Sequence, residues 1–278
     1  MGRSHQHIEI IDEAGLKLMR RAGLVVAAGL KAMMAAAVPG ATTRQVDAVG
    51  AEVLARHGAK SNFLNYAPGY GIPPYPAVSC LSVNNEVVHG IPGDRILQDG
   101  DLLSIDFGGI IEGYNGDAAR SVIIGQADPR VEALSEATRQ SLWAGIGAAR
   151  IGGTIGDISA AVERSLRLGR YGIVRDFTGH GIGHQMHQEP DIPNYRVGRG
   201  PVIRAGMCLA IEPMATLGGY RVAMLDDDWT VVTADSSVAA HWENTITVTE
   251  QGLWVLTEED GGEAELTARG LPFGPLSD

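Results

Sequence analysis

Large apolar side chains recur on a helical period through the first forty residues of the chain. Between residues 9 and 38 they stand amid alanines, at Ile10, Leu16, Met19, Leu24, Leu30 and Met33. Pro39-Gly40 ends this run, because proline interrupts a helix and glycine suits the residue after its end. Thr42-Thr43 offers an N-cap for a further helix, which His57-Gly58 ends. The pattern predicts one or two helices before Pro39-Gly40 and another helix after it.

Beyond a loop rich in glycine, proline and tyrosine at residues 62–76, the pattern changes to that of β-strands. Residues 77–88 and 101–108 are predicted strands, and residues 118–125 form the predicted return arm of a hairpin. The same order then recurs along the second half of the chain. Helices are predicted over 129–151 and 154–168, followed by strands near 172–177, 207–214, 230–233, 241–249 and 253–257.

The repeated order of two helices followed by strands indicates an internal duplication. Four positions also match at a constant offset of 112 residues, which pairs Gly40, Thr42, Val46 and Leu54 with Gly152, Thr154, Ile158 and Leu166. We therefore expect one α+β domain over residues 1–257, built from halves at about 9–125 and 126–257 that enclose a shared cleft. Residues 258–278, rich in acids and glycine, are predicted to form a loose tail.

Composition and charge narrow the class of protein. With 278 residues and 45% apolar content, the chain is long enough to bury a large core. It holds no apolar run of the roughly 18 residues that a membrane span needs, and its start lacks the apolar core of a secretory signal, so we expect a cytoplasmic protein. A net charge of −11 with scattered Lys and Arg argues against a nucleic-acid surface. Cys80 and Cys208 are too few for a disulfide framework.

Two aspartates flank a turn in the predicted hairpin. Asp106 stands in an apolar run, and Asp117 follows the turn-prone residues 112–116. If the strands pair symmetrically about this turn, the two side chains face each other roughly 5 Å apart. Two half-buried anions at that distance repel unless a proton or a cation lies between them. The alternative is a longer hairpin in which one aspartate only caps a turn.

Three histidines follow at positions i, i+4 and i+7, a spacing that imitates a helical zinc site. They are His180, His184 and His187. Glycines at 179, 181 and 183 argue against a helix, because glycine is costly there and favours a tight loop or close approach. A single histidine is most often an ordinary surface or core residue, and His184 is assigned to that class. His180 and His187 are the better candidates for a site.

Two glutamates complete a set of candidate metal ligands. Glu212 and Glu243 each lie in an apolar, strand-like run with no adjacent Lys or Arg. Together with the residues above, they give five oxygen or imidazole ligands and no thiolate, namely Asp106, Asp117, His180, Glu212 and Glu243. Such a set suits two adjacent divalent ions of the Mn, Fe, Co or Zn type.

The motifs around these residues resemble those of the type I, bacterial methionine aminopeptidases of the pita-bread metallohydrolase family M24. The resemblance spans about residues 9 to 257 in order. It rests on Asn85-Glu86-Val87-Val88-His89-Gly90-Ile91-Pro92, Ile105-Asp106-Phe107-Gly108, Asn115-Gly116-Asp117, Gly179-His180-Gly181-Ile182-Gly183, Met186-His187-Gln188-Glu189-Pro190, Ile211-Glu212-Pro213-Met214 and Trp242-Glu243. It implies a pita-bread fold of two pseudo-symmetric halves, with a mostly antiparallel sheet flanked by helices.

The resemblance also implies roles for individual residues. Asp117 and Glu243 would bridge two divalent ions (Co, Mn, Fe or Zn), Asp106 would bind one, and His180 and Glu212 would bind the other. Glu212 would shuttle a proton, while His89 and His187 would contact the bond to be cleaved and stabilise the tetrahedral intermediate. The methionine pocket would include Tyr75, Cys80, Met186 and Trp229.

The implied activity is removal of the initiator methionine from nascent chains with a small second residue. Nascent N-termini near the ribosome are the expected partners, without nucleic acid or membrane, and a monomer is the expected state. Three positions differ from the family's usual pattern. Val88 stands where many relatives carry cysteine, Asn244 replaces a histidine that commonly follows the bridging glutamate, and His241 precedes Glu243 by two.

Three other functions compete with this one. Xaa-Pro aminopeptidases and prolidases keep the five ligands, but the sequence His89-Gly90-Ile91-Pro92 and the compact length favour a methionine enzyme. Non-catalytic binding modules of the same fold have lost the ligands, and here all five residues are present. A structural protein with incidental acidic clusters would bind no metal tightly, so a metal titration separates that alternative.

Overall fold

The computed structural model describes residues 8–69 and 71–277, in which five helices and fourteen strands follow one another. The helices are α1 (Glu13–Ala36), α2 (Thr43–Arg56), α3 (Pro129–Ala148), α4 (Ile155–Leu168) and α5 (Glu263–Ala268). The strands are β1 (Ser79–Val83), β2 (Glu86–Val88), β3 (Leu102–Ile111), β4 (Tyr114–Ile123), β5 (Gly172–Ile173), β6 (Gly179–Gly181), β7 (Gln188–Ile192), β8 (Cys208–Ile211), β9 (Met214–Thr216), β10 (Val222–Met224), β11 (Val231–Thr233), β12 (Ala239–His241), β13 (Asn244–Thr249) and β14 (Gly252–Val255).

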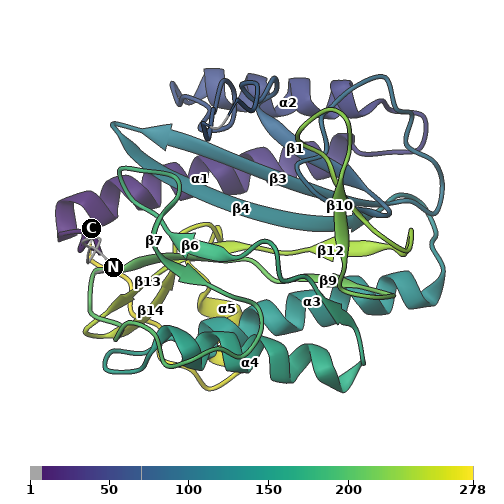
Figure 1. Ribbon diagram of the computed structural model, residues 1–278. Coiled ribbons are helices and arrows are strands. Elements are labelled where there is room, and N and C mark those ends of the chain that lie inside the picture. Colours follow the sequence, from purple (N-terminus) through teal and green to yellow (C-terminus); the bar gives the residue numbers. More distant parts are fainter. Residues whose placement is uncertain (1–7, 70, 278) are drawn as a thin grey trace.

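Strand pairing groups the strands into four small sheets. Their orders are β1-β3-β4, β14-β13-β8-β6-β7, β10-β11-β2 and β12-β9-β5, and every ladder between strands of the described chain is antiparallel. In Figure 1 the helix pair α3–α4 lies below the strands, while α1 runs behind the long hairpin β3–β4 and α2 lies above it. The predicted α+β class with mostly antiparallel pairing is confirmed.

Each helix pair covers its own apolar core. Residues of α1 and α2 pack with β1, β3 and β4, and residues of α3 and α4 pack with the five-stranded sheet. Phe107 of β3 is fully buried against Gly29 of α1 and Gly50 of α2, where a β-carbon at Gly29 would collide with its ring and one at Gly50 would lie only 3.0 Å from it. Because side chains alternate along a strand, Asp106 then points to the opposite face, away from these helices.

The hairpin β3–β4 has a different register from the predicted one. Asp106 lies opposite Ala119 and Asp117 lies opposite Gly108, so the two aspartates are diagonal neighbours on the same face. The reason is the turn, in which Glu112 and Gly113 both have positive φ (49° and 89°) and form a two-residue connection. The aspartates still meet, because a shift of two residues keeps a side chain on its face.

The second helix of each pair, α2 and α4, begins in the same way. Thr42 and Thr154 are N-caps of capping boxes, completed by Gln45 and Asp157 respectively, and each of the following helices has 14 residues. Gly40 and Gly152, two residues earlier, have positive φ (91° and 79°). Each capping threonine also forms an antiparallel bridge to a later segment, at Ile96 and Val202. These shared details support the proposed duplication.

The C-terminal segment is not loose, contrary to the prediction. Helix α5 buries Leu266 completely, and Phe273 forms a parallel bridge with Leu253 of β14. Three acidic residues of this segment form ion pairs: Glu258 with Arg120, Glu259 with Lys31, and Glu265 with Arg139 and Arg269.

Two main-chain hydrogen bonds join the halves beside the shared cleft. The Glu243 N–H donates to the Ala119 carbonyl at 3.0 Å, and the Ala119 N–H donates to the Glu243 carbonyl at 3.4 Å. The buried Arg120 guanidinium also donates to the Glu243 carbonyl. Residue 243 is therefore held in place by β4 of the other half. Within the described residues, no helix is both long and apolar enough to cross a membrane.

Candidate metal centre and its pocket

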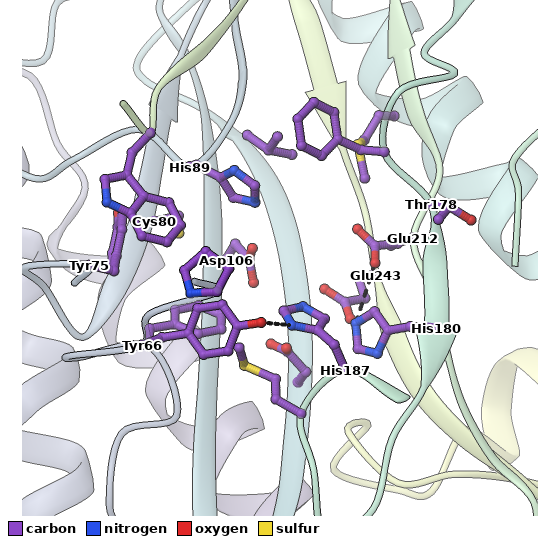
Figure 2. Close-up of a pocket in the computed structure, with 18 of the residues that line it drawn as sticks. Tyr66, Tyr75, Cys80, His89, Asp106, Thr178, His180, His187, Glu212 and Glu243 are labelled. Carbon is purple, nitrogen blue, oxygen red and sulfur yellow. Dashed lines mark hydrogen bonds and ion pairs between the residues drawn. The ribbon is translucent and has the colours of Figure 1, made fainter. Parts of the chain in front are cut away.

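A cavity of about 430 Å³ opens between the two halves. Its walls combine acids and histidines with apolar and aromatic side chains from both halves, among them Phe63, Tyr66, Ile72, Tyr75, Cys80, His89, Asp106, Asp117, Phe177, His180, Met186, His187, Glu212, Met224, Trp229 and Glu243. Figure 2 shows Asp106 on one side of this cavity and Glu212, Glu243 and His180 on the other.

All five predicted metal ligands line this cavity. Asp106 and Asp117 come from the hairpin β3–β4, and His180 comes from β6, which is a short strand rather than a helix. Glu212 follows β8 directly, and Glu243 precedes β13 directly. These residues are distant in sequence but lie close together in the sheet. The C-terminal end of β8 lies beside the start of β13 and beside His180 of β6, and all three face the hairpin of the other half.

The negative charges of these buried acids repel one another. Burial, followed by the charges of Asp117 and Glu212, raises the pKa of Asp106 well above its ordinary value. Burial and neighbouring carboxylates also raise the pKa of Glu212 and of Glu243, and burial raises the pKa of Asp117 to about 7. One carboxylate oxygen each of Asp106, Asp117 and Glu243 is buried and finds no hydrogen-bond partner among the described residues.

These unpartnered oxygens fit divalent cations. Ligand atoms of Asp117, His180 and Glu243 lie within 4.8 Å of one another, and the same holds for a second group of Glu212, His241 and Glu243. Among the residues that the structure describes, Asp106 belongs to neither group but borders the same cavity. Carboxylate and imidazole donors suit first-row divalent ions, whose charge would remove the repulsion between the acids.

Metal binding is expected to release protons, and metal removal is expected to make stability fall with rising pH. The four carboxyls have raised pKa values, so the metal-free folded state holds more protons than the unfolded state above their ordinary values of about 4. Above about pH 7 the buried histidines are neutral in both states, so only the acids change protonation. The unfolding free energy of the metal-free protein should therefore decrease from about pH 7 upward.

Calorimetry checks this expectation directly. Titration of Mn²⁺ into chelator-treated protein at about pH 7, in two buffers of different ionisation enthalpy, should show net proton release. The thermal midpoint in chelator should fall between about pH 7 and 8.5, while a saturating metal concentration should remove that decline. Binding without proton release would contradict the raised pKa values.

His89 and His187 lie on the same cavity as the acids. His89 has a positive φ of 61° and stands edge-on to Phe177 and Trp229, and desolvation lowers its pKa to about 4. The His187 ring lies 4.4 Å from the His180 ring, and its Nδ1 contacts the Tyr66 hydroxyl at 2.9 Å. If this hydroxyl donates, the His187 proton sits on Nε2. His184 is exposed and pairs with Glu9, outside the cavity lining.

The four residues assigned to a methionine pocket form one apolar cluster beside these histidines. Tyr75, Cys80, Met186 and Trp229 are all buried and pack together with Phe63 and Ala77. The Tyr75 hydroxyl donates to the carbonyls of Ser79 and Gly90, and the Trp229 Nε1 donates to the carbonyl of Pro73. Their polar atoms are thus satisfied, so the rings present only apolar surface to the cavity.

Sequence reasoning missed three residues that support the site. Tyr66 and Phe177 contact the two histidines, and Arg120 binds the carbonyl of Glu243, stacks on Trp242 and pairs with Glu258. Tyr66 lies in a loop whose glycines and prolines gave no periodic signal. Arg120 follows Asp117 by three residues, and its distance in sequence from Glu243 concealed their contact.

Known proteins are similar to this chain in sequence and in fold. A model of metallopeptidase family M24 matches residues 17–250. A methionine aminopeptidase 1 from Mycobacterium tuberculosis is 48% identical over 250 residues, which cover 87% of this chain and 92% of that protein. The crystal structure of a methionine aminopeptidase from Thermotoga maritima is similar with a TM-score of 0.86 and 38% identity, covering 91% of this chain and 100% of that chain.

A prolidase from Pyrococcus furiosus shares the fold more distantly. Its TM-score is 0.70 at 21% identity, over 90% of this chain and 65% of that chain. This likeness concerns the fold alone. Together with the stronger likeness to the Thermotoga maritima structure, it confirms the predicted fold class.

Proposed function

Because this chain belongs to metallopeptidase family M24, we propose that it is a methionine aminopeptidase, which removes an N-terminal methionine with the help of two divalent ions. One observation carries the proposal. An apolar pocket of Tyr75, Cys80, Met186 and Trp229 lies beside a cluster of acids and a histidine. The unpartnered, buried oxygens of these acids require a cation. Such a pocket suits an unbranched thioether side chain, and the neighbouring acids suit Co, Mn, Fe or Zn ions.

Different residues of the chain bind the ions, transfer a proton and stabilise the transition state. Asp106, Asp117, His180, Glu212 and Glu243 would hold the ions, which would supply a Lewis acid and activate a water molecule. Glu212, at the cavity wall, accepts a proton and delivers it to the leaving amine. His187 donates a hydrogen bond to the carbonyl oxygen as negative charge develops there. His89, held between Phe177 and Trp229, contacts the scissile region from the methionine side.

Shortening the pocket side chain of Met186 should weaken selection of methionine. Met186 is buried in the pocket cluster, so Met186→Ala leaves space that the substrate side chain does not fill. We expect kcat/KM for a Met-Gly-Xaa peptide to fall about 10- to 200-fold, the range for lost pocket contacts. The decrease for a Phe-Gly-Xaa peptide should be smaller. Met224→Ala, at an exposed position on the cavity rim, is the matched control and should leave the preference unchanged.

The remaining assignments are also proposals. Nascent polypeptides with a small second residue are the proposed substrates, because acids and histidines share the cavity with the pocket side chains. We propose action in the cytoplasm as a monomer, close to the ribosome, without nucleic acid or membrane as a partner. A net charge of −11 supports the exclusion of nucleic acid.

Peptide cleavage tests the proposed function against the prolidase alternative. Chelator-treated protein is mixed with Met-Gly-Xaa or Xaa-Pro-Xaa peptides, and Mn, Co, Fe or Zn is added back singly. Metal-dependent release of methionine from Met-Gly-Xaa alone is the expected result. Cleavage only before proline would assign the protein to the rival hydrolases. No cleavage with any metal would favour a binding module.

A further inference from the structure

His241 lies directly behind the acids of the metal centre, at the end of β12 and two residues before Glu243. Its side chain is 1% exposed. Its main chain is fixed by two serines of the other half: the His241 N–H donates to Ser121 Oγ at 3.0 Å and to Ser104 Oγ at 3.3 Å, while Ser121 Oγ donates to its carbonyl. The position of the ring is therefore set by the hairpin β3–β4.

The ring nitrogen Nε2 of His241 is buried and finds no hydrogen-bond partner within the described residues. A buried polar atom without a partner is rare, because it loses its interactions with water and gains nothing in return. This nitrogen points at the metal centre: its distance to Glu212 Oε2 is 3.5 Å, and ligand atoms of Glu212, His241 and Glu243 all lie within 4.8 Å of one another.

The carboxylate of Glu212 thus stands between two imidazoles. His180 Nε2 lies 3.5 Å from Oε1, and His241 Nε2 lies 3.5 Å from Oε2. These separations are long for charge-assisted hydrogen bonds, which measure about 2.7–2.9 Å. Two ligand atoms about 2.1 Å from a shared ion in tetrahedral geometry lie roughly 3.4 Å apart. The spacing of His241 and Glu212 therefore fits two donors to one ion.

We propose that His241 is a further metal ligand of this centre, so that the site offers two imidazole nitrogens instead of one. The inference rests on the proposed metal centre. Figure 2 shows Glu212, Glu243 and His180 together on one side of that cavity, opposite Asp106. A second imidazole shifts the preference of a carboxylate site from Mn toward the ions that bind nitrogen more strongly, such as Co, Ni and Zn.

A positioning role would be a different explanation for the same contact. In that case Nε2–H donates to Glu212 and orients its carboxylate, and every divalent ion gains from this to a similar degree. A ligand instead contributes most to the ions with high nitrogen affinity. The ratio of Zn²⁺ to Mn²⁺ affinity therefore distinguishes the two roles, whereas enzyme activity does not.

The test compares His241→Gln with the wild type and with His184→Gln, which alters an exposed histidine outside the cavity lining. Dissociation constants for Zn²⁺ and Mn²⁺ are measured by competition with a fluorescent chelator. We expect His241→Gln to weaken Zn²⁺ binding about 10- to 100-fold and Mn²⁺ binding no more than about 3-fold. The ratio of Zn²⁺ to Mn²⁺ affinity should be unchanged in His184→Gln. Equal losses for both ions, or no loss, would overturn the proposal.

X-ray absorption of the wild type with Zn²⁺ provides the second measurement, in case His241→Gln does not fold. With both positions filled, scattering should correspond to about one imidazole per ion if His180 and His241 both bind, and to half that number if only His180 binds. A wild type that binds neither ion would refute the proposed function as well. A wild type that binds ions through one imidazole would refute only the role of His241.

Discussion

Asp106→Asn is expected to abolish metal-dependent methionine release and, at the same time, to make the metal-free protein harder to unfold. The variant removes a negative charge from a group of buried acids that raise one another's pKa. Without ions, a charge on Asp106 is unfavourable because the side chain is buried and lies near Asp117 and Glu212, so replacing the carboxyl with an uncharged amide is favourable. With ions the same charge would be a ligand, and we expect kcat/KM to fall by at least about 1,000-fold.

Thermal unfolding measures the expected change in stability, and peptide cleavage measures the expected loss of activity. In chelator at about pH 8, the midpoint of Asp106→Asn should exceed that of the wild type by roughly 2–6 °C, which corresponds to about 1–2 kcal/mol in a chain of this size. Asp94→Asn, an exposed aspartate paired with Arg44, serves as the control and should change neither quantity. A variant that loses activity and also stability in chelator would show that Asp106 has a purely structural role.

His187→Gln is expected to lower kcat about 100- to 1,000-fold while metal affinity stays within about 3-fold of the wild type. The ring borders the cavity beside His180, but it belongs to neither group of closely spaced ligand atoms in the described chain. A hydrogen-bond donor to a developing negative charge acts in the transition state, so its loss reduces kcat and leaves binding of the ion intact.

Tyr66→Phe is expected to lower kcat through the same histidine, but by less than His187→Gln. The Tyr66 hydroxyl contacts His187 Nδ1 at 2.9 Å, and by donating to Nδ1 it would favour the tautomer that keeps a proton on Nε2. We expect a decrease in kcat of about 10-fold, smaller than that of His187→Gln, and no further decrease when the two changes are combined. Stopped-flow cleavage of Met-Gly-Xaa at saturating metal measures both. A loss of metal affinity in His187→Gln would mean that His187 is a ligand.

Local signals in the sequence predicted the helices well. Proline, glycine and threonine mark the ends of α1, α2 and α4, because capping chemistry acts within a few residues and is visible in the sequence. The start of α1 is later than predicted, since Asp12 caps it by accepting from the Gly15 N–H. Strands β7 and β10 were missed, because their residues alternate weakly and are defined by pairing with distant strands.

The candidate site was predicted as a set of residues but not as a geometry. An acid within an apolar run signals a partner, and this signal brought out Asp106, Glu212 and Glu243, whereas Asp117 was found from the predicted hairpin and His180 from its glycine-flanked histidine cluster. The register of the aspartates was wrong by two residues, since it depends on the φ angles of Glu112 and Gly113. The positions of Tyr66 and His241 relative to the site follow from tertiary packing between the halves, for which one sequence contains no local signal.

The C-terminal segment also constrains the order of events while the chain is being made. The Arg20 guanidinium of α1 donates to the carbonyls of Val255, Leu256, Glu258 and Glu259, across 235 to 239 residues of sequence. During synthesis α1 emerges first, and these partners emerge 235 to 239 residues after Arg20. Contacts of such sequence separation form late. While the chain is being made, α1 therefore lacks these four hydrogen-bond acceptors until residues 255–259 have left the ribosomal exit tunnel.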